Sequence, residues 1–191
     1  MRKIHSIVSA ILSPICVAVY ITLIFSLFSP IGLGSMNLIQ SVLTGFVFLA
    51  ILPFLIIYSF SKKYGIEIDI NDRKKRTPIF LVIILNYIIA TLIFWFYQNY
   101  IMLLICLSYT IVTSFVMLVN IFWKISVHTA GLTGPLTALI FIFGVSLIPL
   151  YILAIPVAYS RYKLDFHNKM QLLVGGLSPI FITYFIYLIL W

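Results

Sequence analysis

The strongest constraint on the fold is the lack of charge in long stretches of the chain. Only 8% of the 191 residues are Asp, Glu, Lys or Arg, against roughly 25% in a typical soluble domain. All of them lie in four places: residues 2–3, residues 62–76, Lys124, and residues 161–169. Because charged side chains are costly in hydrocarbon, we expect the stretches between these places to lie in a membrane.

Five apolar runs are long enough to cross a bilayer as helices, since about 20 residues at 1.5 Å rise span its hydrocarbon core. The runs cover residues 7–28, 38–60, 79–97, 101–123 and 172–191. Pro53 predicts a kink in the second run. A loop over residues 61–78 separates the second run from the third, and Gln98 with Asn99 predicts a tight, uncharged turn after the third.

The segment over residues 129–159 is also apolar but is interrupted by three prolines and, near its middle, by Gly144. We expect it to form two short helices joined near residues 144–146, because Gly144 and Pro149 interrupt regular helix there. One long tilted helix is the alternative by length alone. The fold class predicted is therefore all-α: one domain over residues 1–191, a polytopic membrane bundle of about six or seven helices, some of them short.

The basic residues indicate a membrane interface rather than a nucleic-acid site. The net charge is +8, but half of the Lys and Arg residues lie in the single loop over residues 61–78, as the positive-inside pattern predicts. Cys16 and Cys106 both lie in apolar runs, so we expect no disulfide between them.

A histidine near the last run has the spacing of an oriented nucleophile. His167 precedes Gln171 by four residues, so on a helix both side chains share one face. The amide carbonyl would then hold one ring nitrogen and leave the other free to attack. Arg161 would clamp a phosphate through its planar fork. The structural alternative is a histidine and an arginine that only anchor the chain at the membrane interface.

A second histidine precedes a run of small residues. Ser126 and His128 come just before residues 129–134, where free backbone N–H groups at a helix start would face an anion. A protonated His128 would supply a proton to a leaving oxygen. Close helix packing through the small residues is the alternative. In the basic loop, Arg73 and Arg76 are three residues apart and would reach one phosphate together, although most of that loop fits a membrane-interface signal.

These three regions together resemble the type-2 phosphatidic acid phosphatase superfamily, which also includes vanadium haloperoxidases. The family pattern of Ser-Arg, five residues, His, three residues and Asp matches at Ser160, Arg161 and His167, with Gln171 in place of Asp. Its Pro-Ser-Gly-His pattern matches at Ser126 and His128. Its Lys, six residues, Arg-Pro pattern is the most divergent, with Thr77 between Arg76 and Pro78. The resemblance covers residues 62–176.

The resemblance implies a metal-independent lipid phosphatase without a cofactor. His167 would form a phosphohistidine, His128 would protonate the leaving group, and Gln171 would orient His167. The residues implied to hold the phosphate oxygens are Arg73, Lys75, Arg76, Ser126 and Arg161. The substrate would be a lipid phosphate or diphosphate, of the polyprenyl or phosphatidate type, and the other partners membrane lipids, with no nucleic acid.

Two other classes of function compete with the phosphatase. A membrane prenyltransferase would bind a diphosphate through magnesium at Asp69 and Asp72, but it needs a second acidic cluster, and Asp165 is the one acid outside that loop. A non-catalytic lipid-binding protein with a degenerate pocket fits the replaced motif positions.

The distribution of basic residues also predicts the topology. The motif regions must share one membrane face if a single phosphate is to meet both histidines. Arg2 and Lys3 would lie on that face too, and the opposite loops, near Gly32 and Gln98, carry no basic residue. The positive-inside rule would place the shared face in the cytoplasm of a multi-pass cell-membrane protein.

Overall fold

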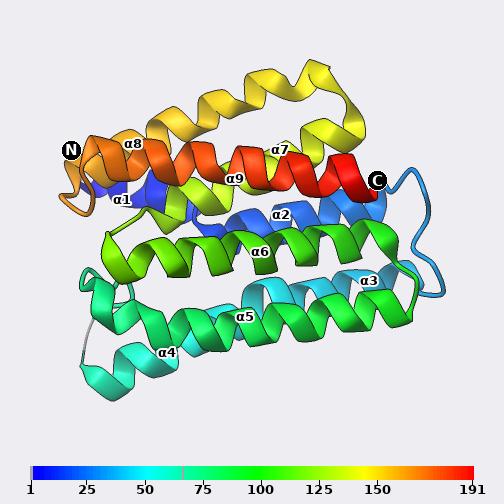
Figure 1. Ribbon diagram of the computed structural model, residues 1–191, viewed down its shortest axis with the longest axis horizontal. Helices are drawn as coiled ribbons and strands as arrows, with labels where there is room; N and C mark the ends of the chain where they lie inside the picture. The colour runs from blue at the N-terminus through cyan, green and yellow to red at the C-terminus, as the bar shows by residue number, and fades with distance from the viewer. Residues whose placement is uncertain (1, 66) are drawn as a thin grey trace.

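The computed structural model describes residues 2–65 and 67–191, and in this part of the chain all regular structure is helical. Figure 1 shows the helices running roughly alongside one another. In chain order they are α1 (Arg2–Ile11), α2 (Pro14–Leu27), α3 (Leu38–Gly45), the π-helical η1 (Phe46–Ile51), α4 (Leu52–Tyr64), α5 (Arg73–Phe96), α6 (Tyr100–Phe122), α7 (Val127–Phe143), the 3-10 helix η2 (Val145–Leu153), α8 (Ala154–Lys163) and α9 (Lys169–Leu190). The all-α fold class is confirmed.

Six helical stretches are long and apolar enough to cross a membrane: Arg2–Leu27, Leu38–Tyr64, Arg73–Phe96, Tyr100–Phe122, Val145–Lys163 and Lys169–Leu190. The shorter helix α7 is also apolar; it has 17 residues and is about 25 Å long. The chain is a multi-pass membrane protein by these criteria, and the expected number of about six or seven helices is confirmed.

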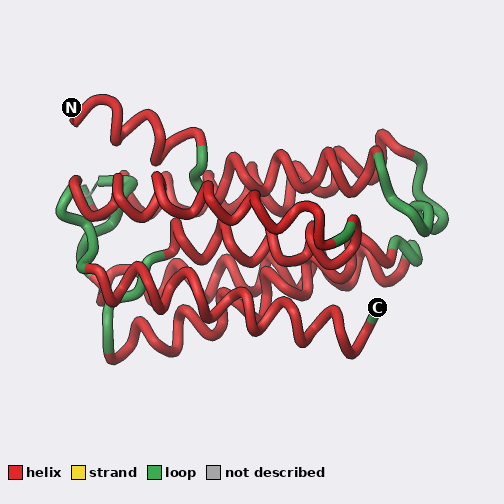
Figure 2. Tube along the Cα trace, turned by 90° about the horizontal axis from the view of Figure 1, so that it is seen from above, coloured by secondary structure: helices red, strands yellow, loops and turns green. Residues whose placement is uncertain are grey.

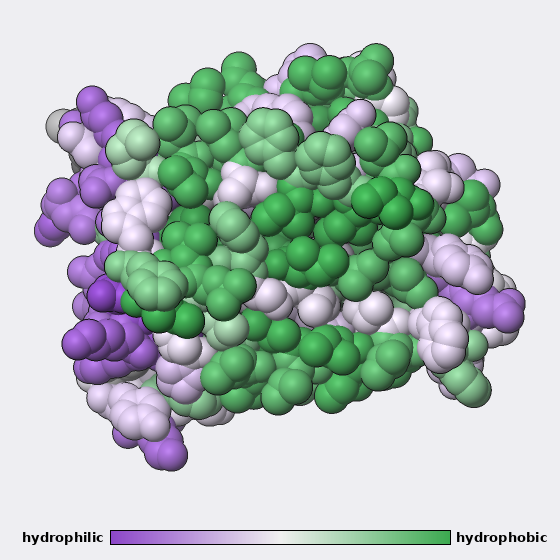
Figure 3. All heavy atoms as spheres, viewed as in Figure 1, coloured by the Kyte–Doolittle hydropathy of each residue, from purple (hydrophilic) through white to green (hydrophobic). Residues whose placement is uncertain are grey.

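The outside of the bundle is apolar, as a bilayer requires. On α5, Leu85, Ile89 and Leu92 are exposed, and Figure 3 shows a broad hydrophobic band between two more hydrophilic ends. Polar side chains are instead paired inside the bundle. Ser41 shares a hydrogen bond of 2.8 Å with Ser26 and accepts another of 3.0 Å from Asn99. Internal pairing of this kind is needed because lipid satisfies no hydrogen bond.

Two tight turns bring neighbouring helices together. Gln98, with φ of +55°, and Asn99, which caps α6, join α5 to α6 as the sequence predicts. Gly144, with φ of +107°, ends α7 and starts η2, so the segment over residues 129–159 does fold as two short helices joined at Gly144. The second continues through α8 to Lys163. In Figure 2 the loops gather at the two ends of the bundle.

Several helices begin earlier than the apolar runs predict. The third span begins at Arg73 rather than at residue 79, because the Asp72 side chain caps α5 and basic residues are tolerated in a turn outside the hydrocarbon. The loop predicted over residues 61–78 therefore shrinks to residues 65–72. The last span begins at Lys169, where Asn168 and Gln171 form a capping box.

The first two spans are less regular than predicted. The first is not one helix, because α1 and α2 are separated at Leu12 and Ser13, just before Pro14. Ser13 caps α2, and its side chain accepts from the N–H of Cys16. In the second span, the π-helical turn η1 lies directly before Pro53, where the sequence predicts a kink. Proline has no N–H to bond the preceding turn, which accounts for irregular helix at this position.

Two adjacent glycines on α9 test how closely α7 and α9 pack. A Cβ at Gly175 would lie 2.7 Å from Ser126 O and from Thr129 Oγ1, whereas a Cβ at Gly176 would meet nothing closer than 3.9 Å. We expect Gly175→Ala to cost about 1–3 kcal/mol through overpacking. Gly176→Ala should be neutral or stabilising by up to about 1 kcal/mol through helix propensity. Thermal unfolding of both variants in detergent checks this, and equal unfolding temperatures would contradict it.

Candidate active site

A cavity of about 680 Å³ opens at the charged end of the bundle. It follows α5 from Arg76 to Tyr87, a distance of about 16 Å along the helix axis. Its lining changes from charged to apolar along this path. The charged and imidazole side chains are Arg2, Glu67, Asp69, Arg76, His128, Arg161 and His167, and the apolar ones include Leu49, Pro53, Phe54, Ile57, Ile79 and Ile83. The cavity is therefore amphipathic.

The three motif regions of the sequence meet in this cavity. Arg76 comes from the first turns of α5, His128 from the first turn of α7, and Arg161 from the last turn of α8. His167 lies in the short loop between α8 and α9 and is buried. Two histidines and two arginines thus line one cavity at one end of the bundle.

The contacts of Gln171 define which nitrogen of His167 is free. Gln171 Oε1 accepts a hydrogen bond of 3.2 Å from the backbone N–H of Asn168, so this atom is the amide oxygen. His167 Nδ1 lies 3.2 Å from the same oxygen and must therefore donate. The imidazole carries its proton on Nδ1, and Nε2 keeps its lone pair. Gln171 orients the ring as the sequence predicts, and it also caps α9.

The surroundings of His167 favour the neutral ring. Burial, followed by the positive charges of Arg76, Lys124 and Arg161, lowers the pKa of His167 from 6.5 to about 3, although the hydrogen bond with Gln171 opposes this shift. A neutral imidazole with a free Nε2 lone pair is the form that acts as a nucleophile. His167 is therefore neutral over the whole physiological pH range.

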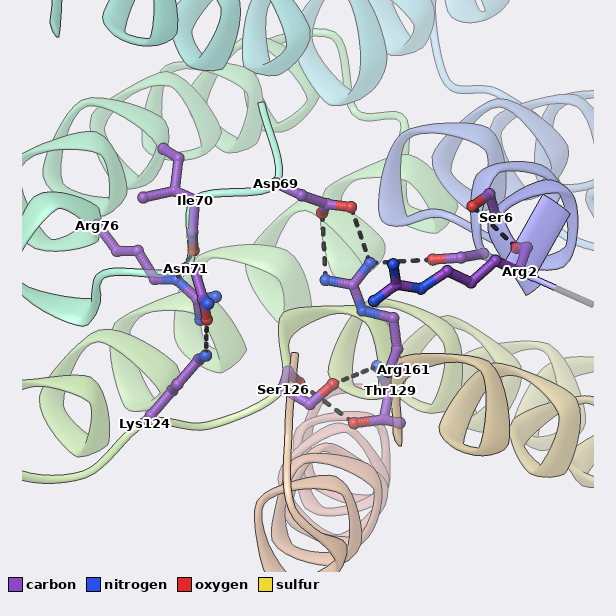
Figure 4. Close-up of polar contacts among 11 residues, drawn as sticks. Arg2, Ser6, Asp69, Ile70, Asn71, Arg76, Lys124, Ser126, Thr129 and Arg161 are labelled. Carbon is purple, nitrogen blue, oxygen red and sulfur yellow. Dashed lines mark hydrogen bonds and ion pairs between the residues drawn. The ribbon is translucent and has the colours of Figure 1, made fainter. Parts of the chain in front are cut away.

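Arg161 is the most completely buried charged side chain at this end, and Asp69 neutralises it. Arg161 donates from both terminal nitrogens to the two Asp69 oxygens, at 2.9 and 3.2 Å, and one of these nitrogens also donates to Ser9 Oγ at 3.1 Å (Figure 4). Its guanidinium carbon lies 4.0 Å from the centre of the Phe166 ring. The planar fork thus already holds a bidentate oxyanion, the geometry with which arginine also binds phosphate.

The ion pair keeps Asp69 charged. Burial alone raises the pKa of this carboxyl, but the hydrogen bond and the positive charge of Arg161 outweigh burial and bring the pKa below its usual value. Unlike Arg161, whose side chain is 2% exposed, Asp69 is 43% exposed. The carboxylate therefore reaches the buried guanidinium from the solvent side of the cavity.

Arg76 fixes the loops around the cavity. It donates from Nε to Ile70 O at 2.7 Å and from Nη1 to Ile125 O at 3.2 Å. Nearby, Lys124 donates to Asn71 Oδ1, and burial, with the charges of Arg76 and Arg161, lowers the pKa of Lys124. Arg76 therefore ties the segment before α5 to the segment before α7.

Three residues predicted to bind phosphate do not line the cavity. Arg73 donates to the backbone oxygens of Asn120 and Ile121 at the end of α6. Lys75 is exposed on the outside of α5. Ser126 is fully buried as the cap of α7, where its hydroxyl accepts from the N–H of Thr129. Arg73 and Ser126 therefore make their contacts at helix ends, and Lys75 lies at the surface.

The polar cavity residues that were not predicted as part of the site include Arg2, Ser9 and Asp69. Ser9 and Arg2 come from α1, which the sequence indicates only as a membrane span. The sequence suggests Asp69 only as a candidate magnesium ligand of a prenyltransferase. Over the described ranges, no group of three or more His, Cys, Asp and Glu side chains is placed to hold a metal ion.

Comparison of the chain with protein-family models, curated proteins and solved structures finds no match. The function is therefore argued from the cavity and its residues.

The low pKa of His167 predicts acid-sensitive stability. Between pH 6.5 and about 3 the unfolded chain protonates this histidine and the folded chain does not, so the free energy of unfolding falls as pH falls through that window. His167→Asn removes this contribution. Thermal unfolding in detergent between pH 7 and pH 4 should show a smaller decrease for the variant than for the wild type, and parallel curves would refute the assignment.

Proposed function

We propose that the protein is a membrane lipid phosphatase or diphosphatase that acts through a phosphohistidine. The observation that carries the proposal is the amphipathic cavity, which combines His128, His167, Arg76 and Arg161 at one end with an apolar lining along α5 and α4. A lipid phosphate has the same division, with an anionic head and an apolar chain. The arginines would bind the head, and the apolar lining would hold the first part of the chain.

The proposed reaction has two steps. First, the Nε2 lone pair of His167 forms a bond to phosphorus while the bond from phosphorus to the leaving oxygen breaks, and His128 gives a proton to that oxygen. Burial and the charge of Arg161 lower the pKa of His128 to about 3, so the negative charge of the bound phosphate would have to hold this proton on the ring. Then water attacks phosphorus, neutral His128 takes a proton from the water, and the N–P bond breaks to release inorganic phosphate. Arg76 and Arg161 would stabilise the charge on the phosphoryl oxygens in both steps.

Gln171 affects the first step through the histidine it orients. An amide oxygen can hold Nδ1–H in place, but it cannot balance the positive charge that His167 gains on phosphorylation as a carboxylate would. Gln171→Asp is therefore expected to keep the hydrogen bond and to add the missing negative charge. It also restores the residue type that the resembled phosphatase superfamily has at this position.

Phosphate release from purified protein tests the proposal. We expect hydrolysis of a polyprenyl diphosphate or a phosphatidate without added metal, with inhibition by vanadate. His167→Ala should reduce the rate to background and His128→Ala by about a hundredfold or more, whereas Lys74→Ala, on the exposed outside of α5, should match the wild type. A strict requirement for magnesium, or full activity of His167→Ala, would overturn the mechanism.

A non-catalytic lipid-phosphate-binding protein is the second candidate. The pairing of Arg161 with Asp69 favours it, because the arginine fork is occupied by the protein's own carboxylate. Binding of lipid phosphates without phosphate release, by wild type and Gln171→Asp alike, would support this candidate over the enzyme.

The same ion pair predicts competition between Asp69 and a bound phosphate. Asp69→Asn should strengthen binding of inorganic phosphate or vanadate roughly tenfold, since a charge-assisted bidentate contact no longer has to be broken. Inhibition or thermal-shift titrations measure this change. Weaker binding in Asp69→Asn would mean that the carboxylate positions Arg161 for the phosphate instead of competing with it.

For topology, we propose that the charged end with its cavity faces the cytoplasm of a cell membrane. Lys3, Lys62 and Lys63 support this, because they do not line the cavity and follow the positive-inside rule. Reporters fused to the N-terminus and inserted in the loop over residues 65–72 should both read cytoplasmic, and two external signals would reverse the assignment.

A further inference from the structure

The first helix of the chain forms a separate wall of the cavity. α1 is separated from α2 at Leu12 and Ser13 and does not continue its axis; in Figure 2 it diverges from the bundle at this joint. One side of α1 carries isoleucines that are at least half exposed, and the other side lines the cavity with small and hydroxyl residues. The isoleucines are Ile4, Ile7 and Ile11, and the cavity residues are Ser6, Ser9 and Ala10.

Contacts to α8 hold this wall beside the catalytic arginine. Ser9 accepts a hydrogen bond from Arg161, and His5 Nδ1 lies 3.4 Å from Ser160 Oγ. The His5 ring also packs edge-on against Tyr159, at 5.4 Å between ring centres. α1 is therefore docked on the same helix turn that presents Arg161 to the cavity.

Arg2, near the start of α1, is a cation in this cavity without an anionic partner. Its side chain extends toward Arg161 in Figure 4, and it lines the same cavity as Arg161 and Ser9. In residues 2–65 and 67–191, Asp69 forms an ion pair with Arg161, and no acidic group pairs with Arg2. Asp69 already neutralises Arg161, so the nearby guanidinium of Arg2 adds positive charge that would stabilise a further anion.

We propose that Arg2 forms a second anion subsite that takes the other phosphate of a lipid diphosphate. This inference rests on the proposed function for the first subsite, where Arg76, Arg161 and His167 receive the phosphate that reacts. Asp69 already neutralises Arg161, so Arg76 and Arg2 are the guanidiniums of this cavity that no carboxylate pairs with in the described residues. A lipid diphosphate carries more negative charge than a phosphate monoester, and Arg2 would balance the added charge. The substrate class favoured is therefore the diphosphate, not the phosphatidate type.

Lys3 offers a matched control for Arg2. Both residues are basic, exposed and adjacent in α1, but only Arg2 lines the cavity. Their alanine variants therefore change the overall charge equally and the cavity differently. The probes are orthophosphate, which fills one subsite, and methylene diphosphonate, which carries two phosphoryl groups joined by carbon and cannot be hydrolysed between them.

Thermal-shift titration of the full chain in detergent measures binding of both probes. We expect Arg2→Ala to weaken binding of methylene diphosphonate about tenfold and that of orthophosphate less than twofold, with Lys3→Ala close to wild type for both. Equal effects of the two variants, equal loss for both probes, or no diphosphonate binding by wild type would overturn the subsite. If the expected binding pattern is found but the protein releases no phosphate from a lipid diphosphate, the subsite is supported and only the proposed hydrolysis is refuted.

Discussion

The structure depends on the cost of placing charge and unpaired backbone in hydrocarbon. The chain meets this constraint by keeping its formal charges to the helix ends and loops at one end of the bundle, where Figure 3 shows the most hydrophilic surface. Because the charged side chains are confined to one end, the Lys and Arg side chains lie close together there. Arg76 and Arg161 are buried beside His167, and Asp69 compensates only part of their charge. The excess of positive charge in the cavity is thus a direct result of how the chain avoids charge in the membrane.

The sequence predicts the spans well, because hydrophobic length alone decides where a helix can cross a bilayer. It predicts the ends of the helices less well. α5 extends back to Arg73 through a charged turn, since the cap at Asp72 and water outside the hydrocarbon set that end. The break before Pro14 is also missed, because proline at the first position of a helix does not interrupt hydrophobicity. Gly144 is predicted correctly, since glycine and nearby prolines there leave few other places for the turn.

In the site, a contact between residues close in sequence is predicted from their spacing, whereas contacts between residues far apart in sequence are not predicted. The four-residue spacing predicts the contact of His167 with Gln171, although His167 lies in the loop before α9 and not on the helix itself. The structure adds the tautomer through the N–H of Asn168. In contrast, Arg161 meets Asp69 and Ser9 across separations of 92 and 152 residues. No sequence pattern specifies such partners. The position of Arg73 also could not be foreseen, because its role depends on where α6 ends.

The one-sided distribution of charge has a consequence for energetics across the membrane. A transmembrane voltage acts on a charge in proportion to the part of the field that the charge crosses, about 2.3 kcal/mol per elementary charge for each 100 mV. The charged residues and the charged part of the cavity lie at one end of the bundle, outside most of this field. An anion that reaches the arginines from that end crosses little of the voltage. For the anionic ligand proposed here, concentration and ionic strength would therefore set the occupancy of the cavity, and the membrane voltage would contribute little.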